Sequence, residues 1–176
     1  MMNITAKISE DNEKVKKLYM QSFPENERLP WWLLRFLTVR KGIDITAYYD
    51  KKDFCGFTYT VTNGNIVFVL FFAVKYELRS KGYGSAILRY LKDNNPDKDI
   101  LLNIELLDES TDNYADRVRR YEFYIKNGFY DTGYNIDEVG DTFRVMSTSE
   151  SVDVSDYLEI FSKMSFGLWK PRIIKA

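Results

Sequence analysis

The stretch IVFVLFFAVKYELRSKGYGS, residues 66–85, decides the fold. Nine apolar residues from Ile66 to Val74 run without a break, which is typical of a central strand buried on both faces. Gly82 and Gly84 follow a short polar segment and open a stretch with helical periodicity. A buried strand, a glycine-containing turn and a helix in this order predict an α/β unit.

The turn at residues 79–85 predicts an anion-binding site. Glycine allows a ligand to come close to the backbone, and the free amides at a helix start attract negative charge. Arg79 and Lys81 add positive charge, so a pyrophosphate fits. The Gly-Lys-Ser/Thr ending of a nucleoside-triphosphate loop is absent, and Ile87 stands where a dinucleotide fingerprint has its third glycine. The remaining pattern is Arg-x-x-Gly-x-Gly.

The rest of the chain continues the alternation of strands and helices. Besides residues 66–74, strands are expected at residues 4–8, 45–49, 54–61, 100–106, 129–134, 142–146 and, in the tail, 169–174. Asn63-Gly64 predicts a hairpin. Helices are expected from a cap at Asp11 or Asn12 to Ser22, over Trp31–Val39, from Gly82 to about Asn94, around Val118–Ile125, and from about Ser155 to Met164.

Composition narrows the function classes. The 176 residues include 25 basic and 26 acidic side chains, so the chain lacks the broad positive charge of a general nucleic-acid binder. The absence of histidine excludes a Ser-His-Asp triad and a His-ligated zinc, and the single Cys55 excludes an intrachain disulfide. We therefore expect no metal site. The longest apolar run is too short to cross a bilayer, and the start lacks signal-peptide features, so a cytoplasmic protein without a membrane partner is expected.

A second motif lies later in the chain. Residues 123–129 read FYIKNGF, with an aromatic pair near a helix end and a glycine stop, and the strand between the two motifs contains Glu105. In this order, the buried strand with Arg79-x-x-Gly82-x-Gly84, the Glu105 strand and Phe-Tyr-x-x-x-Gly-Phe resemble the GCN5-related N-acetyltransferase (GNAT) superfamily. The resemblance covers about residues 45–146.

The resemblance implies an α/β (α+β) fold. Its mixed, twisted, mostly antiparallel sheet has six to seven strands, splays open between the fourth and fifth strands, and is flanked by about four helices. Residues 1–150 would form the acetyltransferase domain. Residues 151–176 would be a helix and strand extension packed on the same domain, where it either covers the acceptor site or completes a homodimer.

The resemblance also implies acetyl-CoA as co-substrate, bound in the split of the sheet. A bulge in the strand at residues 66–74 would leave amides near Phe72, Ala73 and Val74 for the pantetheine arm, with the Val74 amide on the thioester oxygen. The pyrophosphate would rest on the backbone of Arg79, Ser80, Lys81, Gly82, Tyr83, Gly84 and Ser85.

Two residues have catalytic roles implied by the resemblance. Tyr124 matches a tyrosine near the cofactor sulfur that can protonate the leaving thiolate, although a core tyrosine is the alternative. Glu105 interrupts an apolar strand and matches a glutamate that accepts the proton of the substrate ammonium. The alternatives are a solvated strand face shared with Asn103, and a chain of water molecules as the base.

The implied function is N-acetyltransfer to a primary amine, on a small molecule or a peptide, by direct attack in a ternary complex. A catalytically silent acyl-CoA-binding or regulatory module of the same fold is the alternative. A nucleotide-binding protein is a third interpretation, which the incomplete nucleotide motifs disfavour.

Overall fold

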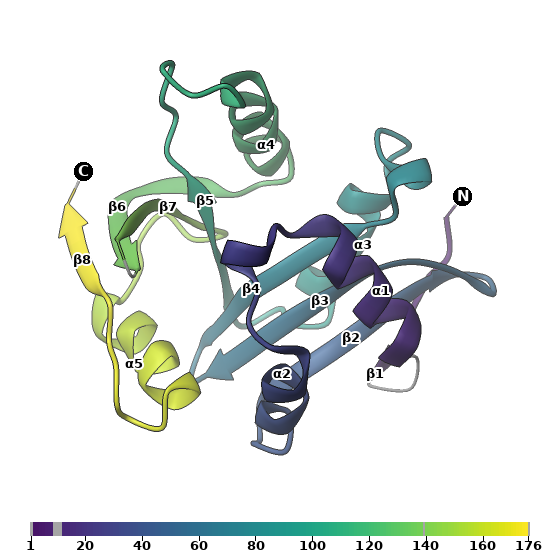
Figure 1. Ribbon diagram of the computed structural model, residues 1–176, viewed down its shortest axis with the longest axis horizontal. Coiled ribbons are helices and arrows are strands. Elements are labelled where there is room, and N and C mark those ends of the chain that lie inside the picture. Colours follow the sequence, from purple (N-terminus) through teal and green to yellow (C-terminus); the bar gives the residue numbers. More distant parts are fainter. Residues whose placement is uncertain (1, 9–11, 139, 176) are drawn as a thin grey trace. The chain divides into compact units, whose positions relative to one another are not determined.

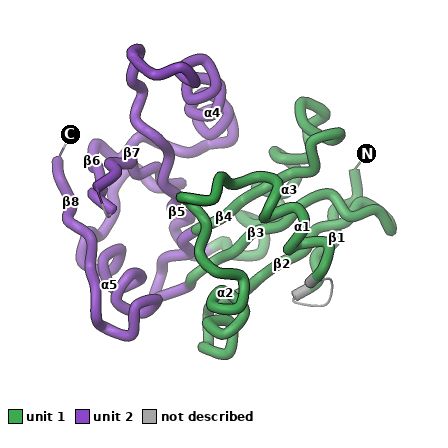
Figure 2. Tube along the Cα trace, in the orientation of Figure 1, with its two compact units in different colours: residues 1–61, 69–96 green, residues 62–68, 97–176 purple. Residues whose placement is uncertain are grey.

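The computed structural model describes residues 2–8, 12–138 and 140–175 (Figure 1). The chain forms two compact units (Figure 2). Unit 1 comprises residues 1–61 and 69–96, and unit 2 comprises residues 62–68 and 97–176. Asp11, one of the two residues predicted to cap the first helix, lies outside the described residues.

The strands of unit 1 are antiparallel neighbours. β1 (Ile4–Ile8) pairs with β2 (Ile43–Asp50), and β2 pairs with β3 (Asp53–Asn63). β4 (Ile66–Val74) has the bounds that its apolar run predicts. The turn between β3 and β4 consists of Gly64 and Asn65, one residue later than predicted, and Gly64 adopts the left-handed backbone (φ 52°) that such a turn requires.

The helices of unit 1 follow the predicted order. They are α1 (Asn12–Ser22), the 3-10 helix η1 (Glu25–Glu27), α2 (Trp31–Leu37), the 3-10 helix η2 (Tyr76–Leu78) and α3 (Tyr83–Asp93). α2 begins directly after Pro30, whose ring fixes a backbone angle suited to a helix start.

α1 and α3 cover opposite faces of the unit 1 strands. The ring of Tyr19 in α1 contacts Phe57 and Phe71, with centroids 6.3 and 5.0 Å away. The ring of Tyr90 in α3 contacts Tyr48 at 5.8 Å. Phe57 pairs with the residue before Tyr48, so these two side chains point to opposite faces of the strands. Burial on both faces explains why β3 and β4 are apolar with little alternation.

Unit 2 contains the remaining elements. They are β5 (Asp99–Glu105), α4 (Tyr114–Lys126), β6 (Tyr130–Glu138), β7 (Asp141–Ser147), α5 (Val154–Met164) and β8 (Arg172–Lys175). β7 pairs with β5 and with β6, and β8 pairs with β6, all antiparallel. The amide of Asp99 donates to the carbonyl of Asn65 at 2.8 Å, which joins the start of β5 to the turn before β4.

The strand order is β1-β2-β3-β4-β5-β7-β6-β8, and the boundary between the units falls inside β4, after Phe68. This mixed, mostly antiparallel α/β arrangement confirms the predicted fold class. The described residues contain eight strands and five α-helices, as many as the sequence patterns predict and more than the six to seven strands and about four helices that the resemblance implies, because the tail contributes both α5 and β8. The splay between β4 and β5, the bulge in β4 and the division at residue 150 stay predictions.

The tail helix α5 is part of unit 2. The side chain of Asp153 caps it by accepting hydrogen bonds from the amides of Ser155 (2.8 Å) and Asp156 (3.1 Å). Its buried face includes Tyr157 and Phe161, and both rings contact Phe68 at the start of β4, at 5.7 and 5.4 Å.

Gly56 allows the closest backbone approach in unit 1. A Cβ atom at this position would lie 2.4 Å from the carbonyl oxygen of Ala73 and 3.2 Å from Cδ1 of Ile87 in α3. Gly56→Ala should lower the free energy of unfolding by about 3 kcal/mol, because β4 or α3 must move to admit the methyl group. Urea denaturation measures this loss.

Gly140→Ala is the control, since a Cβ there meets nothing within 4 Å and adds only the strain of a left-handed backbone (φ 97°). An equal loss in both variants would contradict the predicted clash.

Candidate functional site

The turn after β4 carries the residues predicted to bind the cofactor. The Lys75 amide donates to the carbonyl of Cys55 at 2.9 Å, which ends the pairing of β4 with β3. The chain then passes through η2. Ser80 (φ 59°) and Gly82 (φ 85°) both adopt the left-handed backbone, and α3 begins directly after Gly82. Two left-handed residues therefore turn the chain from the strand into the helix.

The start of α3 presents amides that its own helix cannot satisfy. The carbonyl of Gly82 accepts its hydrogen bond from the Ala86 amide at 3.0 Å, and no side chain caps this end. The amides of Tyr83, Gly84 and Ser85 precede that first bond and point out of the helix end. Together with the helix dipole they suit the anion site that the sequence predicts, and Gly84 has no side chain to cover them.

Two side chains of this turn, those of Arg79 and Tyr83, form hydrogen bonds with residues of the neighbouring strands. Nε of Arg79 donates to the carbonyl of Val74 at 3.3 Å, and its guanidinium group lies 5.5 Å from the centroid of the Tyr76 ring. The hydroxyl of Tyr83 donates to Asp50 at 3.2 Å. Arg79 thus supports the turn at the same time as it contributes positive charge beside it.

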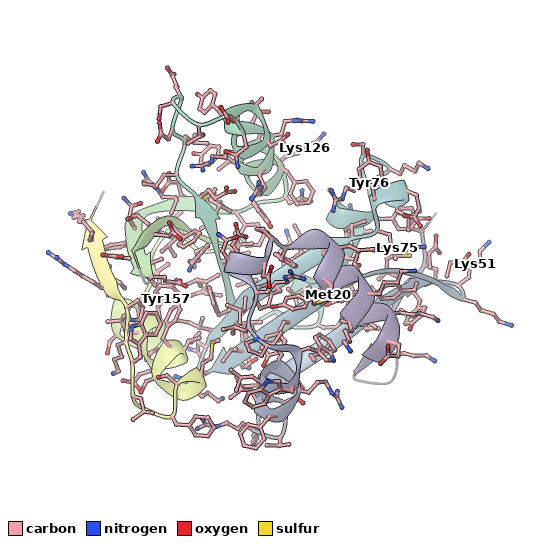
Figure 3. The ribbon with its side chains drawn as sticks, viewed as in Figure 1. Met20, Lys51, Lys75, Tyr76, Lys126 and Tyr157 are labelled. Carbon is pink, nitrogen blue, oxygen red and sulfur yellow. The ribbon has the colours of Figure 1, made fainter. Side chains whose placement is uncertain are left out.

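A hollow of about 660 Å³ lies next to the turn in unit 1. Figure 3 labels Lys75 and Tyr76, two of its lining residues. The hollow is formed by α1, the β2–β3 hairpin and the segment around η2. Five of its lining side chains are cationic and two are acidic: Lys14, Lys17, Lys52, Lys75 and Arg79 against Asp53 and Glu77. The surface beside the turn is therefore positive although the chain as a whole has a formal charge of −1.

The residues of β4 predicted to contact the pantetheine arm alternate in exposure. Ala73 is buried, whereas Phe72 and Val74 are half-buried. Half-buried Phe72 and Val74 share one face of the strand. These three residues and residues 79–85 all belong to unit 1.

Tyr124 lies near the end of α4 in unit 2. It is the buried residue of that helix, and its ring contacts Phe123 and Phe129 at 5.2 and 5.5 Å. Burial raises the pKa of the Tyr124 phenol to about 12, against a smaller opposing effect of Arg120. The phenol is therefore protonated at neutral pH, and its raised pKa makes it a weaker acid than a solvated tyrosine, so its role as proton donor stays a prediction.

Glu105, at the end of β5, is held by donors from α4 and the loop before it. Its carboxylate accepts a hydrogen bond from Asn113 at 3.1 Å, lies 3.5 Å from Nε of Arg117, and forms an ion pair with Arg120. These contacts anchor α4 to β5. They also occupy the oxygens that a substrate ammonium would need, so the catalytic role of Glu105 stays a prediction.

Unit 2 contains a second carboxyl group, Glu138, that sequence reasoning missed. Nδ2 of Asn103 donates to Oε1 of Glu138 at 2.8 Å, and the hydroxyl of Tyr157 donates to Oδ1 of Asn103 at 2.7 Å. Burial raises the pKa of Glu138 to about 7, against the opposing effect of the Asn103 hydrogen bond. Glu138 therefore exchanges a proton near neutral pH.

The sequence alone gives little indication that Glu138 has these contacts or a raised pKa. Glu138 follows Asp137 between the strands predicted at residues 129–134 and 142–146, where acidic residues are usually solvated. Asn103, its hydrogen-bond partner, precedes it by 35 residues. Tyr157, which donates to Asn103, follows it by 19 residues in α5. The polar Asn103 in an apolar strand was the available signal, and its partner depends on how β6 and α5 pack.

The part of the chain that the structure describes contains neither a candidate membrane-spanning helix nor a candidate metal site. None of the described helices combines the length and apolar content required to cross a membrane. Among the same residues, no three His, Cys, Asp or Glu side chains are grouped so that they could hold a metal ion.

No protein-family model matches the sequence, and no curated protein matches it significantly. Many solved structures do match this chain. A Bacteroides thetaiotaomicron protein assigned to the GNAT acetyltransferases is 23% identical, with a TM-score of 0.73, over 96% of this chain and all of that one. An aminoglycoside 6′-N-acetyltransferase in complex with coenzyme A is 19% identical, with a TM-score of 0.65, over 86% of this chain and all of that one.

The ribosomal-protein-S18-alanine N-acetyltransferase of Escherichia coli is 13% identical, with a TM-score of 0.63, over 87% of this chain and 96% of that one. The chain therefore has the GNAT fold, which confirms the fold that the sequence motifs imply.

The raised pKa of Glu138 predicts a pH-dependent stability. The unfolded group titrates near 4.5 and the folded group near 7, so the folded state binds the extra proton between these values. The wild-type protein should therefore lose about 3 kcal/mol of stability relative to Glu138→Gln as the pH rises from below 4.5 to above 7. Urea denaturation of both proteins across this range measures the difference.

Glu122→Gln, which changes an exposed carboxylate of α4, is the matched control and should show no such trend. A pH-independent difference between Glu138→Gln and the wild-type protein would contradict the burial of the charged group.

Proposed function

We propose that the protein is an N-acetyltransferase that uses acetyl-CoA to acetylate a primary amine in a ternary complex. The observation that carries the proposal is the turn after β4, where left-handed Gly82 leaves the first amides of α3 available to a pyrophosphate. The GNAT fold supports it, and one of the similar acetyltransferases was crystallised with coenzyme A.

In this proposal acetyl-CoA contacts the two parts of unit 1 named above. The pyrophosphate lies on the amides of Gly82–Ser85 beside Arg79 and Lys81. The pantetheine arm follows β4, where its amides take the place of a neighbouring strand along Phe72–Val74. The Val74 amide donates to the thioester oxygen and stabilises the negative charge that develops there during attack.

The reaction proceeds by direct transfer. The neutral amine nitrogen attacks the thioester carbonyl carbon, a C–N bond forms, and the C–S bond breaks as the tetrahedral intermediate collapses. The phenol of Tyr124 donates a proton to the departing thiolate, and the proton released by the new amide nitrogen returns to it through solvent. Holding both substrates in one site supplies much of the rate enhancement.

A silent acyl-CoA-binding module is the second candidate. The observation that favours it is the contact of Glu105 with Arg117 and Arg120, because the carboxylate implied as the base is already neutralised by two cations. Such a module would retain the cofactor-binding turn and lack turnover.

Turnover with an amine panel separates the two candidates. The panel is spermidine, an aminoglycoside and a peptide with a free N-terminal alanine, because acetyltransferases of this fold carry these acceptors in their names. We expect release of free CoA thiol, followed with a thiol reagent, with at least one of them. Binding of acetyl-CoA by calorimetry without turnover of any amine would instead support the module.

Gly84→Val should weaken acetyl-CoA binding at least tenfold, because a branched side chain at this position covers the free amides of α3. Isothermal titration calorimetry gives the affinity. Ala86→Val is the matched control in the same helix, since the Ala86 amide already donates to Gly82 and is not offered to a ligand. Unchanged affinity in Gly84→Val would remove the pyrophosphate from this turn.

Tyr124→Phe should lower kcat by about tenfold or more while the affinity for acetyl-CoA changes little, because only the proton donor is lost. Steady-state kinetics and calorimetry give the two values. Tyr121→Phe, three residues before Tyr124 on the same helix, is the control and should retain activity. A fully active Tyr124→Phe would make Tyr124 a packing residue.

A further inference from the structure

The hollow of about 660 Å³ in unit 1 is distinct from the surface proposed for the cofactor. Among the described residues predicted to bind the cofactor, at 72–74 and 79–85, Arg79 alone lines the hollow. Tyr83, Gly84 and Ser85, whose amides begin α3, are not part of its walls. The positive charge that gathers in the hollow therefore needs an explanation of its own.

One wall of the hollow is a single face of α1. Lys14, Lys17, Leu18 and Gln21 line it at intervals of one, three or four residues, which places them on one side of the helix. Lys16, the residue beside Lys17, does not line it. In the described part of the chain Lys17 forms no ion pair, so its ammonium group is available to a ligand.

The other walls come from the β2–β3 hairpin and the segment after β4. Lys52 lies in the two-residue turn of the hairpin and lines the hollow, whereas its neighbour Lys51 does not. Lys75 also lines it, but its ammonium group is paired with Glu77 at 2.6 Å. Lys52 forms no ion pair with any residue that the structure describes. Two lysines without an internal counter-charge, from separate elements, therefore line the same hollow.

The hollow also has apolar surface. Leu18 is buried, Phe54 is half-buried, and Tyr76 is 80% exposed. An exposed aromatic ring can pack against a planar or apolar group of a ligand. Positive charge beside apolar side chains, in a volume within the range of small-molecule sites, favours a small anionic ligand that has an apolar part.

We propose that the hollow binds a small organic phosphate, that is, a phosphate monoester of an apolar or aromatic group. The phosphate contacts the ammonium groups of Lys17 and Lys52, and the organic group packs against Phe54 and Tyr76. A phosphate monoester has nearly two negative charges at neutral pH, which match the two lysines. A nucleic acid would need a wider basic surface than one hollow, and the formal charge of the chain is −1. The inference does not rest on the proposed function.

Isothermal titration calorimetry with phenyl phosphate tests the site. At pH 8 and low ionic strength we expect saturable binding with a Kd of about 1 mM or lower. The affinity should fall about tenfold between pH 8 and pH 5, because the second pKa of the phosphate is about 6 and the ligand loses one charge. Benzenesulfonate keeps a single charge over this range, so it should bind more weakly and show no such fall.

Two double variants locate the site. Lys17→Gln with Lys52→Gln should weaken the binding of phenyl phosphate by about tenfold or more, because both phosphate contacts are lost. Lys16→Gln with Lys51→Gln is the matched control, since it removes the same charge from the two neighbouring positions outside the hollow. The control should change the affinity by less than about threefold. None of the four side chains is buried, so both variants should fold.

Equal losses of affinity in the two double variants would overturn the inference, since they would indicate a general effect of charge. Absence of saturable binding up to about 10 mM phenyl phosphate would overturn it as well. Displacement of phenyl phosphate by acetyl-CoA would assign the hollow to the cofactor and would also overturn it. If acetyl-CoA itself does not bind, the proposed function falls, and the two double variants still decide the phosphate site.

Discussion

The left-handed backbone of Gly82 is the constraint on which the candidate site depends. A strand that is buried on both faces must end and reverse into α3 within a few residues, and the turn leaves three amides without acceptors at one point. The same geometry excludes a capping side chain at Gly82, which would otherwise satisfy those amides from within the protein. The predicted anion site is therefore a consequence of how β4 joins α3, and Arg79 supports that junction through the carbonyl of Val74.

Two glutamates in unit 2, Glu105 and Glu138, show how the local environment gives the same chemical group different properties. Glu105 receives donors from Asn113, Arg117 and Arg120, so its charge is compensated inside the protein. Glu138 receives an amide donor in a half-buried position, and partial burial raises its pKa to about 7. Because its charge is compensated by arginines, Glu105 is suited to holding α4 on β5. Because Glu138 lacks such compensation among the described residues, it takes up a proton more readily.

Local patterns predicted most of the fold. The apolar run predicted the bounds of β4, the glycines marked the start of α3, and the helix expected from about Ser155 to Met164 matches α5. The motif around Tyr124 placed that residue near a helix end, where it is buried. The tail strand, expected at residues 169–174, is the shorter segment Arg172–Lys175, because only these residues pair with β6.

What the sequence could not predict depends on contacts between distant segments. The two arginines that neutralise Glu105 lie on α4, and their approach to β5 follows from the packing of that helix. The hydrogen bond between Asn103 and Glu138 depends on how the β6–β7 hairpin packs against β5, which no local pattern specifies.

The tail strand β8 has a consequence for the edge of the sheet. A sheet edge with unpaired backbone groups invites pairing with another chain, and β8 covers β6 with a short strand that begins at Arg172 and ends at Lys175. Short edge strands that carry charged side chains disfavour edge-to-edge pairing of one molecule with the next, and β8 has both features.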